Sequence, residues 1–291
     1  MATLSQWIEG ARPRTLPAAV SPILVGTGAA YETGHVVWAY AILALAVALL
    51  LQVGVNYAND YSDGIRGTDE VRVGPVRLVG QRLAAPASVK TAAFVAFFFA
   101  ALLGLALVAL SELWVMVPIG AAAILAAWYY TGGSRPYGYL GLGEVFVFVF
   151  FGLVATLGTM GTMTGLTAAG WWGAIGVGSL ASAILVANNL RDIPTDREHG
   201  KRTLAVRMGE RGTRGFYLVL LALAFVMTGL AALTSPWALL ALLAAPLAVA
   251  PVRAVVGGAT GRGLIPALAG TGRFELVWSV LLAVGLALGH P

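Results

Sequence analysis

Nine apolar stretches divide the sequence, and they restrict the chain to a membrane-spanning helical fold. A helix that crosses the hydrocarbon core of a bilayer needs about 20 mainly apolar residues. Only 11% of the residues are charged, whereas a soluble domain carries about 25%. We therefore predict an all-α polytopic membrane protein whose residues 1–291 form a single transmembrane domain. The nine stretches run approximately over residues 15–31, 36–58, 88–109, 113–131, 142–163, 169–190, 213–233, 237–256 and 273–289.

The basic residues fix the orientation of these helices. If the N-terminus is cytoplasmic, the cytoplasmic segments carry all 18 lysines and arginines. The outer loops, near 32–35, 110–112, 164–168 and 234–236, carry none. Cytoplasmic loops are enriched in Lys and Arg, so we predict a multi-pass protein of the cell (cytoplasmic) membrane with an external C-terminus. The net charge of +5 then reflects topology, and we expect no nucleic acid partner.

The composition also excludes several kinds of site. The chain has no cysteine, which excludes disulfides, thiolate zinc sites and iron–sulfur ligation. Its three histidines, His35, His199 and His290, are scattered along the sequence and do not indicate a histidine metal site. There is also no dinucleotide-binding fingerprint and no P-loop.

Two polar ladders stand at the predicted cytoplasmic ends of the second and sixth apolar stretches. The first consists of Asn56, Asn59, Asp60 and Asp63, at positions i, i+3, i+4 and i+7. The second consists of Asn188, Asp192 and Asp196, at positions i, i+4 and i+8. On helices, each spacing places its residues on one face. Because polar groups near hydrocarbon are costly, such clusters indicate a functional site.

The two ladders carry the oxygen ligands that magnesium prefers. Mg²⁺ usually binds one or two carboxylates together with substrate phosphates and water. The predicted metal ligands are Asn59, Asp60, Asp63, Asp192 and Asp196. The alternative is that these aspartates cap helix ends or pair with nearby arginines, although that reading does not explain two clusters that each follow a helical ladder spacing.

Basic and aromatic residues beside the ladders suggest what the metal would hold. Arg77, Arg135 and Lys201 each lie near a polar motif, and guanidinium and ammonium groups suit phosphate binding. Contact with anionic lipids is the other reading for basic residues of this kind. Asn56, Tyr130 and Asn188 are candidates for a substrate pocket, although Tyr130 would also suit an interfacial aromatic belt.

The motifs resemble those of the UbiA superfamily of intramembrane aromatic prenyltransferases. The first matching motif is Asn59-Asp60-x-x-Asp63 with a later Asp69, and the second is Asn189-x-x-Asp192-x-x-x-Asp196. The stretch from Tyr130 to Glu144 resembles more narrowly the branch of the superfamily that acts on a naphthoate. Gly67 and Arg135 depart from the common pattern, which has Asp and Lys near these positions.

This resemblance implies both a fold and a reaction. The fold would be nine transmembrane helices around a central cavity with cytoplasmic cap loops. The reaction would be the Mg²⁺-dependent transfer of a polyprenyl group from a polyprenyl diphosphate to 1,4-dihydroxy-2-naphthoate. Two Mg²⁺ ions would bind the diphosphate, carbon dioxide would leave, and the product would be demethylmenaquinone, in menaquinone biosynthesis. Asp69 and Glu144 are both candidates for the catalytic base.

Two other functions fit parts of the sequence. A related prenyltransferase could use another aromatic acceptor, such as 4-hydroxybenzoate. A cation-coupled transporter is the alternative from a different class, because intramembrane carboxylates also mark ion pathways. Transporter sites usually lie near the middle of the bilayer, whereas both ladders lie at the cytoplasmic ends of their helices.

Overall fold

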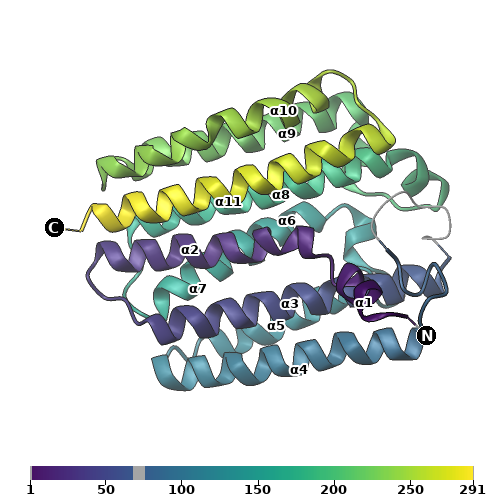
Figure 1. Cartoon of the computed structure of the whole chain (residues 1–291), viewed down its shortest axis with the longest axis horizontal. Coiled ribbons are helices and arrows are strands. Elements are labelled where there is room, and N and C mark those ends of the chain that lie inside the picture. Colours follow the sequence, from purple (N-terminus) through teal and green to yellow (C-terminus); the bar gives the residue numbers. More distant parts are fainter. Residues whose placement is uncertain (1, 68–75, 291) are drawn as a thin grey trace.

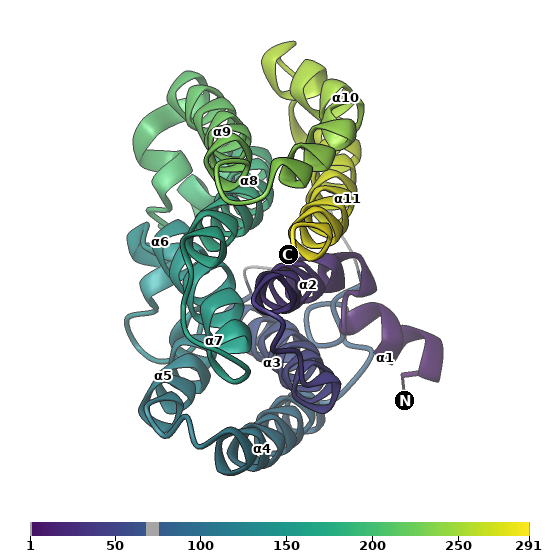
Figure 2. The same ribbon diagram turned by 90° about the vertical axis from the view of Figure 1, so that its left-hand side faces the viewer.

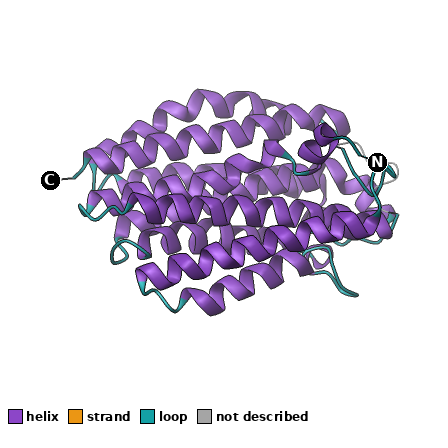
Figure 3. Ribbon diagram, turned by 60° about the horizontal axis from the view of Figure 1, so that its bottom comes forward, coloured by secondary structure: helices purple, strands orange, loops and turns teal. Residues whose placement is uncertain are grey.

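The computed structural model describes residues 2–67 and 76–290, and all regular structure in these residues is helical (Figure 3). Nine long helical segments among them correspond one to one to the nine predicted apolar stretches. They are α2 (Leu16–Glu32), α3 (Trp38–Ile65), α4 (Pro86–Ser111), α5 (Met116–Tyr129), the continuous α6–η3–α7 (Gly143–Val147, Phe148–Val154, Ala155–Gly161), α8 (Ala168–Glu198), α9 (Leu204–Ala231), η4–α10 (Pro236–Ala244, Ala245–Val256) and α11 (Ile265–Leu288). The prediction of an all-helical protein with nine helices is confirmed for the described residues.

Short helices complete the chain at the loops. They are α1 (Leu4–Gly10), η1 (Pro13–Thr15), η2 (Tyr137–Leu140) and η5 (Gly261–Leu264). Seven of the described helical segments are long and apolar enough to cross a membrane, while α2 and α5 are shorter, with 17 and 14 residues. The long helices run roughly parallel or antiparallel to one another, with the N-terminus at one end of the bundle and the C-terminus at the other (Figure 1).

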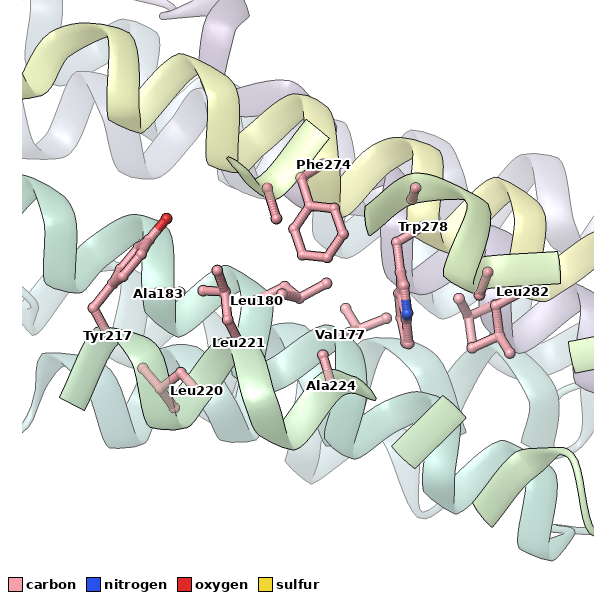
Figure 4. Packing of buried hydrophobic residues seen from close by; sticks show 14 of the residues in the cluster. Val177, Leu180, Ala183, Tyr217, Leu220, Leu221, Ala224, Phe274, Trp278 and Leu282 are labelled. Atoms are coloured by element: carbon pink, nitrogen blue, oxygen red, sulfur yellow. The ribbon is translucent and has the colours of Figure 1, made fainter. Parts of the chain in front are cut away.

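Seen along their axes, the helices are arranged in a ring (Figure 2). Helix α8 packs against α9, α11 and η3, and α2 packs against α11 and α7. The core between α8, α9 and α11 is drawn in Figure 4. Its labelled side chains are Val177, Leu180, Ala183, Tyr217, Leu220, Leu221, Ala224, Phe274, Trp278 and Leu282.

Two aromatic residues of this core make hydrogen bonds between helices. The Tyr217 hydroxyl lies 2.7 Å from Thr271 Oγ1, and Trp278 Nε1 donates to Thr228 Oγ1 at 2.9 Å. Both aromatic residues are fully buried. A bilayer interior offers no water as an alternative partner, so these bonds fix α9 against α11.

A glycine pair brings the α6–η3–α7 segment close to α8. A Cβ atom added at Gly152 would lie 2.5 Å from Cα of Gly178, which no larger residue could tolerate without a backbone shift. Small residues allow such close packing of membrane helices. The contact therefore sets how near Glu144, at the start of α6, lies to α8.

Several helices extend farther than hydropathy predicts. Helix α3 continues to Ile65 and α8 continues to Glu198, whereas the apolar stretches end near 58 and 190. Helices α9 and α11 begin at Leu204 and Ile265, slightly more than two turns before the predicted starts near 213 and 273. Hydropathy detects only the part of a helix in lipid, while backbone hydrogen bonding continues into polar turns. Both ladders consequently lie on helices rather than after them.

Candidate active site

The first ladder lies on the last turns of α3, where all four of its side chains are buried. Asn56 binds the N-terminal segment, because its Nδ2 donates to the Ala11 carbonyl at 2.8 Å and to Thr15 Oγ1 at 3.0 Å. Asn59 Oδ1 accepts a hydrogen bond of 2.8 Å from Thr131 Oγ1. The ladder thus contacts the segment before α2 on one side and the α5–α6 loop on the other.

Asp60 binds the loop that precedes α4. Its Oδ2 accepts the backbone N–H of Leu78 at 2.7 Å, and its Oδ1 accepts that of Val79 at 3.1 Å. The carboxylate is completely buried. Backbone amides are good partners for a buried carboxylate, so Asp60 anchors this loop to α3. Its role as a metal ligand stays a prediction.

Asp63 of the first ladder forms an ion pair with Lys201. Its Oδ1 accepts the Tyr139 hydroxyl at 2.8 Å and lies 3.4 Å from Lys201 Nζ. Asp63 and Lys201 are only 3% and 7% exposed. A buried acid and a buried base require such partners, because isolated charges are costly away from water.

The second ladder lies at the end of α8. Arg191 Nη2 donates to Asn188 Oδ1 at 2.9 Å, and the same guanidinium pairs with Asp192. Asn188 Nδ2 lies 3.5 Å from Asp192 Oδ2. Asp196 is buried, and its backbone carbonyl accepts the N–H of Lys201 at 2.8 Å. Lys201 therefore joins the two ladders, since its backbone contacts Asp196 and its side chain contacts Asp63.

Glu144 is buried against α8, where it contacts Asn189. Its Oε1 accepts a hydrogen bond of 2.9 Å from Asn189 Nδ2, and its backbone carbonyl accepts one of 3.2 Å from Ser182 Oγ. Among the described residues, Glu144 Oε2 has no hydrogen-bond partner although Glu144 is only 4% exposed. A buried acceptor without a partner is costly. The role of Glu144 as a catalytic base stays a prediction.

The α5–α6 loop is fixed by Arg66, the C-cap residue of α3. The two Nη groups of Arg66 donate to the carbonyls of Thr131 and Gly133. Within the loop, Tyr137 stacks on Phe146 with ring centroids 3.9 Å apart, and its ring lies 5.5 Å from that of Tyr130. Burial raises the pKa of Tyr137 above its usual range, so this tyrosine is neutral.

The remaining predicted residues differ in their surroundings. Arg77 is buried, only one residue before the backbone that Asp60 holds. Arg135 is exposed. Asp69 lies outside the described residues. A groove on the surface of α4, lined by Lys90, Phe94 and Phe98 among others, contains none of the predicted site residues.

The chemistry of the side chains fits magnesium with a diphosphate. Within residues 2–67 and 76–290, no three His, Cys, Asp or Glu side chains are grouped closely enough to hold a metal by themselves. Magnesium does not need such a group, because phosphate oxygens and water complete its octahedron. Asp63, Asp192 and Asp196 offer hard anionic oxygens, and Asn59 offers a neutral one. Lys201 Nζ lies 3.4 Å from Asp63 Oδ1, and the predicted role of Lys201 in binding phosphate stays a prediction.

Sequence reasoning missed Tyr139 and the contact between Asn189 and Glu144. Tyr139 stands in a loop rich in glycine and tyrosine, where no periodic pattern distinguishes it from its neighbours. Asn189 belongs to the second motif, but its partner is 45 positions away in the sequence. Both contacts depend on how distant parts of the chain pack together, which the sequence alone does not show.

The comparisons with known proteins agree with this arrangement. The profile of the UbiA prenyltransferase family matches residues 19–262. The chain is 54% identical over 293 residues to a Mycobacterium tuberculosis protein named 1,4-dihydroxy-2-naphthoate octaprenyltransferase, and the alignment covers 100% of this chain and 99% of that protein.

Solved structures show the same fold. The apo structure of a UbiA homolog from Aeropyrum pernix K1 matches with a TM-score of 0.70 at 15% identity, covering 93% of this chain and 97% of that one. A UbiA homolog from Archaeoglobus fulgidus, bound to GPP and Mg²⁺, matches with a TM-score of 0.64 at 12% identity, covering 95% and 99%. This chain, a polytopic membrane protein with two buried carboxylate ladders, therefore belongs to the UbiA prenyltransferase family.

Proposed function

We propose that the protein transfers a polyprenyl group from a polyprenyl diphosphate to 1,4-dihydroxy-2-naphthoate with loss of carbon dioxide. The product is the demethylmenaquinone skeleton of menaquinone biosynthesis. The observation that supports this most strongly is the contact of Lys201 with both ladders, through Asp63 of α3 and the backbone of Asp196 of α8. The name of the Mycobacterium tuberculosis relative supports the choice of acceptor.

In this proposal the two ladders hold Mg²⁺ together with the diphosphate. Asp63, Asp192 and Asp196 are the proposed anionic ligands, with Asn59 as a neutral ligand and Asp60 as an anchor of the neighbouring loop. The bound Mg²⁺, two ions by analogy with the family, would neutralise charge on the departing diphosphate. The Archaeoglobus fulgidus homolog bound to GPP and Mg²⁺ supports this part of the proposal.

Basic residues complete the binding of the leaving group. Lys201 and Arg77 are buried beside the ladders, and Arg135 lies exposed in the α5–α6 loop. These cations would stabilise negative charge as it develops on the diphosphate, an effect that is strong where water is excluded. Because the basic residues of the whole chain follow the cytoplasmic pattern, we propose that this site faces the cytoplasm.

The acceptor would react as an electron-rich aromatic ring. The bond between the prenyl carbon and the diphosphate oxygen breaks, and a ring carbon of the acceptor forms the new carbon–carbon bond. Carbon dioxide leaves from that ring carbon, and its bonding electrons restore the aromatic ring. The immediate product of this step is therefore the quinol, the reduced form of demethylmenaquinone. Glu144, whose Oε2 has no partner among the described residues, is a candidate to accept a proton from an acceptor hydroxyl, as is Asp69.

The acceptor can be tested with the purified full-length protein, Mg²⁺ and a long-chain polyprenyl diphosphate. We expect prenylation of 1,4-dihydroxy-2-naphthoate with one carbon dioxide released per prenyl group transferred, and little product from 4-hydroxybenzoate. Products are identified by mass, and carbon dioxide is followed with a carboxyl-labelled acceptor. Efficient prenylation of 4-hydroxybenzoate with its carboxyl group retained would refute the acceptor while leaving the metal site unaffected.

A further inference from the structure

Tyr139 lies where three parts of the site meet, although no carboxylate motif contains it. Its hydroxyl donates to Asp63 Oδ1 at 2.8 Å. Lys201 Nζ lies 4.4 Å from the centre of its ring, and the guanidinium carbon of Arg66 lies 5.5 Å from the same point. Both distances fall within the range of a cation–π contact. One side chain thus contacts an acid and two bases.

The backbone around Tyr139 is held by the loop that precedes α9 and by the first turn of α9. The N–H of Arg202 donates to the Tyr139 carbonyl at 3.0 Å, and the Arg207 side chain donates to the Leu140 carbonyl at 2.9 Å. On the other side, the N–H of Gly138 donates to the Tyr130 carbonyl at 3.0 Å. These contacts fix the backbone from which the Tyr139 side chain extends toward Asp63.

Asp63 Oδ1 receives both the Tyr139 hydroxyl and the Lys201 ammonium. A divalent cation at Asp63 would repel the neighbouring Lys201 ammonium, because like charges at short range in a buried site interact strongly. Lys201 must then move away from Asp63 when the metal binds. A ring face attracts a cation over a broad area, so Lys201 can leave the carboxylate and stay over Tyr139.

We infer that Tyr139 is a positioning residue with two separate tasks in the magnesium–diphosphate site. Its hydroxyl orients the Asp63 carboxylate for the metal, and its ring keeps Lys201 in place to meet the diphosphate once metal occupies Asp63. This inference rests on the proposed function. Residues that orient metal ligands typically contribute about 10–100-fold to metal affinity or activity.

Two substitutions separate the tasks. Tyr139→Phe removes the hydroxyl and keeps the ring, so the Mg²⁺ concentration for half-maximal activity should rise about tenfold or more. The KM for the prenyl diphosphate at saturating Mg²⁺ should stay within about twofold of its original value, since the contact with Lys201 remains. Tyr139→Leu removes both contacts and should raise both quantities.

A binding measurement without turnover gives the second readout. Mn²⁺ prefers the same oxygen ligands as Mg²⁺, and its binding to the purified protein with inorganic diphosphate can be followed by electron paramagnetic resonance. Tyr139→Phe should weaken Mn²⁺ binding about tenfold or more. The matched control is Tyr61→Phe, because Tyr61 lies on the same helix as Asp63 but contacts Trp128 and Lys90.

Lys201→Gln independently tests whether a metal ion displaces the Lys201 ammonium from Asp63. With Mn²⁺ alone, removal of the competing ammonium should tighten metal binding, whereas binding of inorganic diphosphate with Mn²⁺ should weaken. Unchanged metal binding and unchanged Mg²⁺ dependence in Tyr139→Phe would overturn the inference. If the original protein needs no divalent cation for prenyl transfer, the proposed function itself fails; normal metal dependence with no effect of Tyr139→Phe refutes only the positioning role.

Discussion

Arg191 holds both carboxylate oxygens of its neighbour Asp192, with Nε 2.7 Å from Oδ1 and Nη2 2.8 Å from Oδ2. Both residues are less than one-tenth exposed. A two-point contact between a guanidinium and a carboxylate fixes the plane of the carboxylate. A carboxylate has about four lone-pair sites, so Asp192 can accept from Arg191 and also ligate a metal. The pair therefore fixes the orientation of the Asp192 carboxylate in the second ladder.

The carboxylates of the two ladders should be essential for turnover. Asp63→Ala or Asp192→Ala should lower kcat/KM about 100-fold or more, because each removes a proposed magnesium ligand. Loss of a residue that only orients a metal ligand typically lowers metal affinity or activity by about 10–100-fold. Thermal unfolding in detergent checks that the variant is folded. Glu210→Ala is the control, because this acid is half-exposed and pairs with Arg214 one turn along α9, away from both ladders. Near-normal activity of both variants would identify these aspartates as structural groups.

Lys201 should act on the diphosphate and not on the aromatic acceptor. Lys201→Ala should lower kcat/KM for the prenyl diphosphate about 10–100-fold, the equivalent of one hydrogen bond to a charged group. Steady-state kinetics with each substrate varied in turn measures this, with Lys90→Ala as control, because Lys90 is an exposed lysine at the start of α4. A change confined to the KM of the aromatic acceptor would contradict the assignment.

The orientation in the membrane can be tested by cysteine labelling, because the chain has no cysteine of its own. Leu166→Cys lies in a predicted outer loop and Ser134→Cys in a predicted cytoplasmic one, and both positions are exposed. A membrane-impermeant maleimide added to intact cells should label the first and leave the second unlabelled until the cells are opened. The reverse pattern would place the ladders on the external side.

Glu275 of α11 provides a prediction about stability. It is fully buried, and within the part of the chain that the structure describes neither of its carboxyl oxygens has a hydrogen-bond partner. An unsatisfied buried polar group costs about 1–3 kcal/mol. Glu275→Leu replaces the carboxyl group with an apolar side chain and should therefore raise the thermal unfolding temperature in detergent, and Glu275→Gln should change it less. A destabilised Glu275→Leu protein would mean that the carboxyl group has a partner, such as a bound water molecule.

The sequence predicts the helices and the faces of the ladders well because both follow from local patterns. Apolar length locates each membrane helix, and the i, i+4 spacing places Asp192 and Asp196 on one face of α8, as the structure has them. The same patterns underestimate the lengths of α3 and α8. The apolar stretch ends where the helix leaves the lipid, whereas the backbone hydrogen bonds of the helix continue beyond that point.

The partners of the site residues could not be predicted, because they come from distant parts of the chain. The Lys201 ammonium meets Asp63 from 138 positions away, and Asn189 meets Glu144 from 45 positions away. Those contacts depend on how the α5–α6 loop and the segment before α9 fold over the ends of α3 and α8. A single sequence contains the residues of these two segments, but it has no pattern that shows which of them contact the ladders.

The bonds from Asp60 to Leu78 and Val79 have a consequence for how this protein can vary. They tie the backbone of Leu78 and Val79 to the last turns of α3. Arg77 immediately precedes this anchored backbone, so replacement of Asp60 should displace an arginine as well as remove an acid. Position 60 should therefore vary less between species than a contact with metal alone would require.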